Sequence, residues 1–199
     1  LGLALHGYHD SNGVFPPAYQ TKWGGGGVQG AADPITGDAG PGWAWTAAVL
    51  PFLEQASLYS AVNVSIPCGA PANSTATRTT LSVLLCPSAS DSSRTFDVID
   101  QDRTPLATFA RSHYVANAGE LNLWDQPIQD LSTLASGPFY RNARVSIASV
   151  VDGLSNTVFV GEHSPILSDK TWVGVVPGAV VCPRPRWAFT GDVCDYAAA

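Results

Sequence analysis

The spacing of apolar residues changes along the chain from a helical period to a strand period, and this order constrains the fold most. Near the start, four apolar residues recur at intervals of three and four, as on one face of a helix: Leu1, Ala4, Leu5 and Tyr8. After residue 91, short alternating runs such as 95–99 are typical of strands. Helices followed by strands predict an α+β fold, with a helix packed on an antiparallel sheet and long loops between elements.

The helical segments have recognisable ends. The first is predicted to stop at Asn12-Gly13, because glycine readily adopts the left-handed conformation that ends helices. No capping residue precedes Leu1, so we expect Leu1 to be a cut end within a longer helix. A second helix is predicted over residues 45–62, and Pro51 is expected to kink it or to mark its start.

The remaining segments are predicted as loops and strands of one domain, residues 1–199. Two stretches rich in glycine or small polar residues, 18–42 and 63–79, predict long loops. Strands are predicted from alternating or short apolar runs: 95–99, 113–116, 145–150 and 157–160, with a hairpin over 172–181 that turns at Pro177-Gly178.

The chain carries little charge. Charged residues make up 13% of it and the net charge is -6, whereas about 25% charged residues are usual. A negative chain is a poor match for a nucleic-acid backbone, so no nucleic-acid partner is expected. No apolar run approaches the roughly 18 residues that span a bilayer. A surface with few charges favours contact with other molecules, including copies of the same chain.

The four cysteines predict disulfides. They are Cys68, Cys86, Cys182 and Cys194, without a CxxC pair or zinc-finger spacing. An even, widely spaced set favours two bridges and an oxidising compartment. Of the three possible pairings we favour Cys68–Cys86 and Cys182–Cys194, because each closes a short local loop. Four buried free thiols are the alternative.

Six segments, in order, resemble a pilin-like family that is abundant in planctomycetes, whose members carry a prepilin-type N-terminus and have no assigned function. The matching blocks span residues 1 to 162: Leu1–Asp10, Gly42–Trp45, Leu50–Gln55 with Leu58-Tyr59, Leu85–Ser88, Tyr114–Gly119, and Asp152-Gly153-Leu154-Ser155-Asn156-Thr157 continuing to Gly161-Glu162.

The resemblance implies a fold like that of type IV pilins and type II secretion pseudopilins. In that fold a long N-terminal helix packs on an antiparallel sheet, so residues 1–12 would be a remnant of the helix without its apolar half. The last part departs from the family pattern, because His163 is not followed by Asp-Gly. Residues 163–199 are therefore predicted to form a divergent C-terminal part.

Sequence motifs for catalysis are missing. The chain contains no Gly-x-Ser-x-Gly, no His-Glu-x-x-His and no phosphate-binding loop, so we expect no enzymatic activity. The resemblance raises one cofactor candidate, because pseudopilins often hold a structural Ca²⁺. Asp152 and Asn156 are the candidate ligands, and a plain turn with its own hydrogen bonds is the alternative.

Together these observations predict a non-enzymatic, extracellular or cell-surface structural subunit. We expect copies of the chain to assemble into a filament or tube through the globular domain, using residues 18–42, 63–79 and 182–199. Aromatic side chains dominate many interfaces, which makes Trp23, Trp187 and Tyr196 interface candidates. The alternatives are a minor pseudopilin of a type II secretion-like apparatus and a glycan-binding adhesin module.

Overall fold

The computed structural model describes residues 1–23, 32–33, 36–89, 93–121, 123, 126, 128–181 and 195–196. It combines helices with antiparallel strand pairs, which confirms the α+β class. With η for short 3₁₀ turns, the elements in chain order are α1 (Gly2–Asn12), β1 (Tyr19–Trp23), β2 (Asp38–Ala44), α2 (Trp45–Val49), η1 (Leu50–Leu53), α3 (Ala56–Ala61), η2 (Pro71–Asn73), α4 (Ser74–Thr77), η3 (Ser82–Leu84), β3 (Thr95–Ile99), β4 (Pro105–Ala110), β5 (Tyr114–Ala116), η4 (Ile147–Ser149), η5 (Leu154–Asn156), β6 (Val160–Glu162), β7 (Val180–Val181) and β8 (Asp195–Tyr196).

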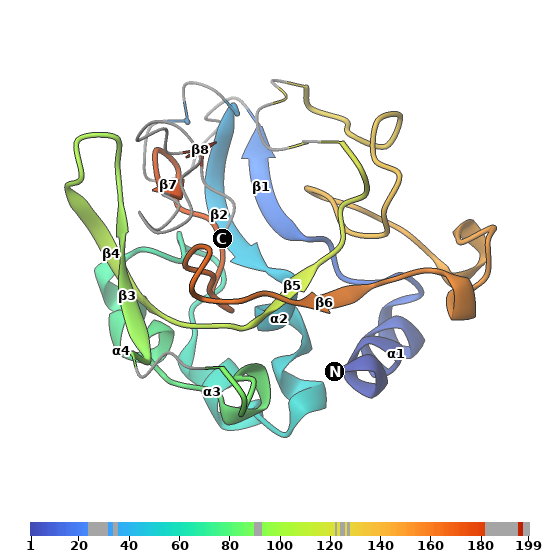
Figure 1. The fold of residues 1–199 in the computed structure, drawn as a ribbon, viewed down its shortest axis with the longest axis horizontal. Helices are drawn as coiled ribbons and strands as arrows, with labels where there is room; N and C mark the ends of the chain where they lie inside the picture. The colour runs from blue at the N-terminus through green and yellow to red at the C-terminus, as the bar shows by residue number, and fades with distance from the viewer. Residues whose placement is uncertain are drawn as a thin grey trace.

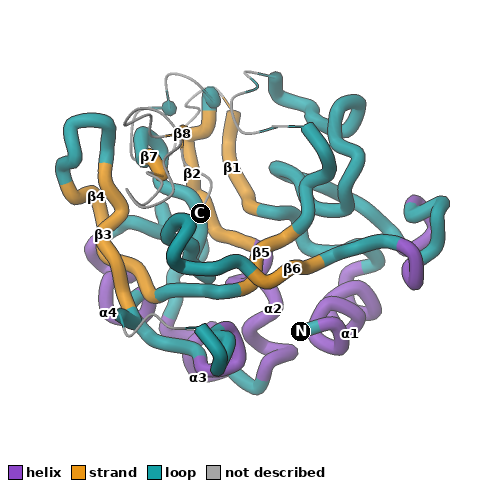
Figure 2. Tube along the Cα trace, viewed as in Figure 1, coloured by secondary structure: helices purple, strands orange, loops and turns teal. Residues whose placement is uncertain are grey.

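The strands form three sheets. β1 pairs with β2, β5 pairs with β6, and the largest sheet has the order β4-β3-β7-β8. Figure 1 shows β3 and β4 on one side of the molecule, α1 on the opposite side, and the helices along the lower edge. Figure 2 shows how much of the trace between these elements consists of loops and turns.

The first helix forms where it was predicted. Gly13 takes the left-handed conformation (φ 75°), and its N–H donates to the carbonyl of His9, which ends α1. Ala4 and Leu5 are the buried residues of this helix. The main contacts of α1 are with α2 and η1, and β3 and β4 lie across the molecule from it.

Residues 45–62 are predicted to form one helix that Pro51 kinks. The change of direction at Pro51 is confirmed, but the segment is not one continuous helix. The segment divides into α2, η1 and α3. Pro51 stands in the first turn of η1, where its missing N–H costs nothing. Glu54 then adopts a left-handed conformation (φ 60°) and separates η1 from α3.

The two predicted loops contain regular structure. Residues 18–42 were predicted to be a loop, but β1 and β2 pair there, with Tyr19 opposite Ala44 and Trp23 opposite Asp38. Gly40 and Gly42 have positive φ inside β2, which permits an irregular register but hides the alternation expected of a strand. Residues 63–79 include η2 and α4, so this prediction of a loop is also wrong in part.

Among the later strands, β3 and β5 confirm their predictions, and β4 was not predicted. The run 145–150 was predicted to be a strand, but it contains the exposed turn η4, which Ser146 and Ser149 cap reciprocally. Of the strand predicted at 157–160, only Val160 belongs to a strand, β6, so most of this prediction is wrong.

The predicted hairpin over 172–181 forms only its turn. The N–H of Ala179 donates to the carbonyl of Val176 at 3.0 Å. Beyond the turn the two arms separate: Gly174 bridges to Trp43, and Val180 pairs with Ile99 of β3.

Two glycines allow the chain to cross itself at the centre of the fold. The N–H of Val175 donates to the carbonyl of Gly42 at 2.8 Å. A Cβ on Gly174 would lie 1.9 Å from the carbonyl oxygen of Gly42, and a Cβ on Gly42 would lie 2.0 Å from that of Val175. Both positions also have positive φ, so this crossing requires glycine on both segments.

The buried side chains form two clusters on either side of β2 and α2. One contains Trp43, Ala47 and Leu50, and the other contains Trp45 and Val49. A buried ion pair joins β2 to the later part of the chain, with Nη1 of Arg141 3.1 Å from Oδ1 of Asp38.

The predicted Cys68–Cys86 disulfide is wrong for this structure, because both residues are buried free thiols. The Cys68 thiol donates to the carbonyl of Val175 at 3.3 Å, whereas Cys86 lies beside His113, whose Nδ1 accepts from the Cys86 N–H. Burial raises the pKa of Cys68 to about 12. Cys182 and Cys194 lie outside the described residues.

Candidate functional site

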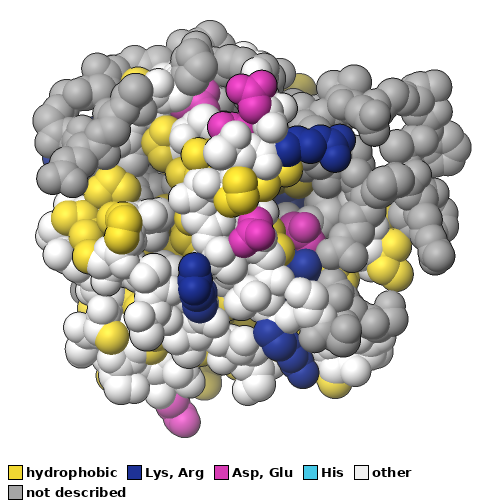
Figure 3. Space-filling model, turned by 90° about the vertical axis from the view of Figure 1, so that its left-hand side faces the viewer, with side chains coloured by type: hydrophobic (Ala, Val, Ile, Leu, Met, Phe, Trp, Pro, Cys, Tyr) yellow, Lys and Arg dark blue, Asp and Glu magenta, His cyan; other side chains and the backbone are white. Residues whose placement is uncertain are grey.

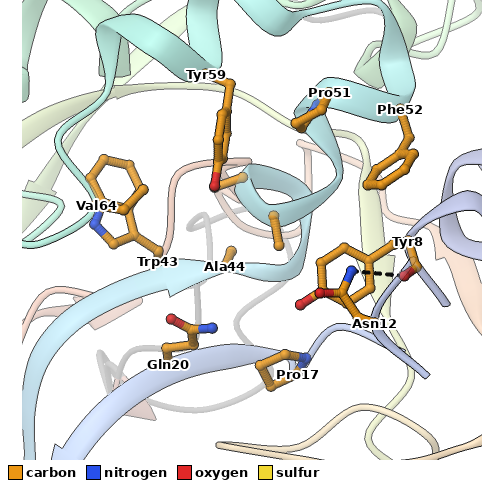
Figure 4. A pocket seen from close by; sticks show the side chains of 12 residues that line it. Tyr8, Asn12, Pro17, Gln20, Trp43, Ala44, Pro51, Phe52, Tyr59 and Val64 are labelled. Atoms are coloured by element: carbon orange, nitrogen blue, oxygen red, sulfur yellow. Dashed lines mark hydrogen bonds between the residues drawn. The ribbon is translucent and has the colours of Figure 1, made fainter. Parts of the chain in front are cut away.

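A groove lies between α1, the β1–β2 pair and the α2–η1–α3 segment. Its deeper part has a volume of about 270 Å³. Figure 4 shows Tyr59 of α3 and Phe52 of η1 reaching into it from one side, with Gln20 and Pro17 of the β1 segment on the other side. Small residues, including Ala44, lie between these walls, so aromatic rings flank an open floor.

The rings of the groove are held in place by their surroundings. Tyr8 packs edge-on against Phe52, with ring centroids 6.1 Å apart. The indole N–H of Trp43 donates to the carbonyl of Ile66 at 3.1 Å. Phe52 and Tyr59 remain 37% and 38% exposed, so these two rings offer apolar faces to a ligand.

Gly7 of α1 makes room for the Phe52 ring. A Cβ at position 7 would lie 2.8 Å from Cδ1 of Phe52. The missing side chain therefore lets the ring lie against α1 and sets one wall of the groove.

The polar groups of the deeper part are uncharged. The side-chain amide of Asn12 donates to the carbonyl of Tyr8 at 2.8 Å (Figure 4), which leaves its oxygen as an acceptor. Gln20 is exposed on β1. Burial raises the pKa of Tyr8, and the nearby Tyr59 raises it further. The Tyr8 phenol is therefore neutral near pH 7 and can both donate and accept hydrogen bonds.

The groove continues into a wider hollow of about 550 Å³ that contains two basic residues. The two hollows share Tyr8, Asn12, Pro17 and Gln20. The wider part extends to Lys22 and Arg144, which are both exposed. Among the described residues that line the two hollows there is no Asp or Glu, although the chain has a net charge of -6.

A second feature is the segment before β6, residues 145–159, which we call the projection. It includes no buried residue, and Figure 1 shows it standing out beside α1. Val151 is 91% exposed and Val158 is 64% exposed. Exposed apolar side chains thus gather on a segment whose other apolar residues, Val145, Leu154 and Phe159, pack only partly buried against the core.

Hydrogen bonds give the projection a defined shape. The N–H of Gly153 donates to the carbonyl of Val150 at 3.1 Å, and the side chain of Thr157 donates to the carbonyl of Gly153. The N–H of Ile147 donates to Nε2 of His9 at 3.2 Å, which ties the projection to α1. The apolar tip is therefore presented by an organised turn.

The candidate calcium ligands lie in this projection. Asp152 and Asn156 are exposed, and the side-chain amide of Asn156 donates to the backbone carbonyl of Asp152 at 2.9 Å. In the part of the chain that the structure describes, no group of three or more His, Cys, Asp or Glu side chains is placed to hold a metal ion. A calcium site at Asp152 and Asn156 stays a prediction.

The structure places the other predicted site residues only in part. The backbone of Trp23 ends β1 and that of Tyr196 belongs to β8, but their side chains are not described, and Trp187 lies outside the described residues. Of the predicted interface loops, residues 18–42 contribute Gln20 to the groove and residues 63–79 contribute Val64.

No sequence motif marks the groove. Its aromatic side chains come from Tyr8 of α1 and from residues 43–59, so no single spacing rule joins them. The family blocks could have indicated the groove. Three of these blocks together contain its four aromatic residues, Tyr8, Trp43, Phe52 and Tyr59.

The surroundings of His163 predict that the protein becomes less stable as the pH falls. Burial and then the neighbouring Lys170 hold the pKa of His163 below its usual 6.5, while its Nε2 lies 3.0 Å from Oγ of Ser168. Below pH 6.5 the unfolded chain gains a proton that the folded chain resists, so the free energy of unfolding falls as the pH falls. Urea denaturation of the wild type and of His163→Gln at pH 7.5 and 5.5 measures this. We expect the free energy of unfolding to decrease less in the variant than in the wild type between pH 7.5 and 5.5. Equal decreases would show that His163 is not the source of the acid sensitivity.

The described residues contain no helix with the length and apolar character needed to cross a membrane. No curated protein and no solved structure matches the chain. Residues 1–187 match a family model described as "Protein of unknown function (DUF1559)". Since this match covers most of the 199 residues, the chain belongs to the DUF1559 family.

Proposed function

We propose that this protein is a non-enzymatic extracellular structural subunit that self-assembles into a filament or tube through its globular domain. The observation that carries the proposal is the projection, residues 145–159, with its exposed Val151 and Val158. A structured turn that points apolar side chains into solvent is a typical feature of an interaction surface.

One face of the molecule favours association as well. Figure 3 shows a face on which Lys, Arg, Asp and Glu are sparse and uncharged groups cover most of the visible area outside the grey atoms. Bringing such surfaces together removes few charges from water, so little desolvation energy opposes contact. The low content of charged residues, 13%, agrees with this view.

The position of the projection suggests the type of assembly. In this proposal the tip of one copy contacts a different surface on the next copy, which is a heterologous, head-to-tail contact. Repeating such a contact gives an open filament or tube unless the rotation closes into a ring. The proposed fold is a divergent pilin-like one in which α1 corresponds to the end of the long pilin helix, and its support is the ordered set of family blocks.

We expect Val151→Asp to abolish assembly while the domain remains folded. Val151 is 91% exposed, so the substitution costs the monomer little, whereas a carboxylate buried in a contact between copies opposes association strongly. Negative-stain electron microscopy and light scattering across a concentration series measure assembly, and circular dichroism measures folding.

The matched control is Leu3→Asp, which places the same charge on another exposed apolar residue, 88% exposed on α1. Assemblies that persist in Leu3→Asp and disappear in Val151→Asp support the proposal. A wild-type protein that stays monomeric at all concentrations, or a Val151→Asp variant that assembles normally, contradicts it.

A further inference from the structure

We infer that the groove between α1, β1 and α3 binds an acidic oligosaccharide. Its sugar rings would stack on Tyr59 and Phe52, and a carboxylate on the sugar chain would lie near Lys22 and Arg144. This site shares no residue with the projection that carries the proposed self-assembly, and neither Val151 nor Val158 lines it, so the two proposals can fail independently.

The aromatic rings supply the first part of the argument. Tyr59 and Phe52 approach from two neighbouring elements and flank a floor that includes Ala44 (Figure 4). Sugar rings carry apolar faces of C–H groups that pack on aromatic rings, while their edges carry hydroxyls. A groove with exposed rings and a small-residue floor offers this packing without moving the backbone.

The neutral polar groups supply the second part. Asn12 presents an amide oxygen, Gln20 presents a whole amide, and the neutral Tyr8 phenol can donate or accept. Hydroxyl groups both donate and accept hydrogen bonds, so amides and phenols suit them. A purely apolar partner would leave these groups without hydrogen bonds, which disfavours such a partner.

The charges supply the third part. Lys22 and Arg144 lie in the wider end, and among the described lining residues no carboxylate opposes them. In a chain of net charge -6, this groove is therefore a local site for an anion. The uncharged aromatic end and the basic end fit a sugar chain with an acidic substituent.

An extended peptide fits the groove less well. Peptides that bind along a strand pair with a free strand edge. The outer edge of β1 is already occupied, because the side chain of Asn142 bonds both the N–H and the carbonyl of Thr21, and the Asn142 N–H donates to the carbonyl of Tyr19. The strand that borders the groove offers no such edge among these residues.

Binding can be measured by calorimetry and by tryptophan fluorescence with pairs of oligosaccharides that differ only in acid groups. Suitable pairs are xylohexaose with its glucuronic-acid-substituted form, and a methyl-esterified hexagalacturonate with the free acid. At 50 mM salt we expect the acidic member of at least one pair to bind about fivefold or more tightly than the neutral member, and 500 mM salt to reduce this ratio.

Variants assign the binding to the groove. Tyr59→Ala is expected to weaken binding by about fivefold, and Tyr59→Phe, which keeps the ring, by less than about twofold. Lys22→Gln with Arg144→Gln should bring the acidic sugar to the affinity of the neutral one. Arg78→Gln, an exposed residue that lines neither hollow, is the matched charge control.

Each of the following results would overturn the inference. No binding to any member at millimolar concentration excludes the site, and binding that Tyr59→Ala leaves unchanged places the sugar elsewhere. Equal affinity for both members of every pair removes the acidic specificity. If Val151→Asp abolishes assembly and all sugars fail to bind, the proposed function stands and this inference falls.

Discussion

Replacing Arg141 by Met is expected to lower the free energy of unfolding by about 3–5 kcal/mol. The Arg141 side chain is 1% exposed and its partner Asp38 is 4% exposed. Removing the guanidinium leaves a carboxylate in the core, where the Tyr19 hydroxyl that donates to it at 2.6 Å remains its hydrogen-bonding neighbour. Nη1 of Arg141 also donates to the carbonyl of Thr36, so this backbone bond is lost too. Urea denaturation at pH 7 measures the effect.

The double variant Asp38→Asn with Arg141→Met is the control. It removes both charges, so no isolated ion stays in the core, and we expect it to be more stable than Arg141→Met alone. Such a recovery distinguishes the buried charge from a simple loss of packing. A decrease below about 1 kcal/mol for Arg141→Met, which is the usual range of exposed pairs, would show that this ion pair is not desolvated in solution.

Replacing Gly174 by Ala is expected to destabilise the protein by about 2–4 kcal/mol, through backbone strain and steric overlap together. The new Cβ would lie 1.9 Å from the carbonyl oxygen of Gly42, and that atom belongs to the backbone and cannot rotate away. The segments must separate, which weakens the hydrogen bond from Val175 to Gly42. Thermal and urea denaturation measure the loss.

Gly178→Ala separates the two causes. Gly178 also has positive φ (80°), but a Cβ there would meet no atom within 4 Å. We expect this variant to be destabilised by only about 1 kcal/mol, the cost of placing a residue with a Cβ in the left-handed conformation. Equal losses in Gly174→Ala and Gly178→Ala would show that the crossing tolerates a methyl group and that the chain is looser there than described.

The parts of the fold that the sequence predicts are those with local signals. The first helix ends at Gly13 because one residue determines that conformation, and Pro51 marks η1 because proline lacks an N–H. Strand β3 follows from a clear alternation at 95–99. In each case the information lies within a few neighbouring residues.

Long-range contacts decide the parts that the sequence does not predict. Residues 145–150 alternate like a strand, but among the described residues no strand pairs with them, and they form a capped turn instead. In β2, by contrast, the glycines disfavour a strand, but the segment forms one because it pairs with β1. Asp38 and Arg141 are 103 residues apart, and composition does not reveal which of the few charges will meet in the core.

The groove was hidden for the same reason. Leu58 and Tyr59 are neighbours in α3, yet Leu58 enters the core and Tyr59 faces the groove. Which of two apolar neighbours stays exposed depends on how α3 packs on the rest of the fold, and α3 follows η1 through the left-handed Glu54.

Residues 43–49 link the two buried clusters, because side chains of this one segment belong to both. Trp43 and Ala47 belong to one cluster, and Trp45 and Val49 belong to the other. Loosening either cluster would pull on the segment that supports the other, so the two halves cannot melt separately. Denaturation should therefore proceed as a single cooperative transition, with tryptophan fluorescence and far-ultraviolet circular dichroism changing together.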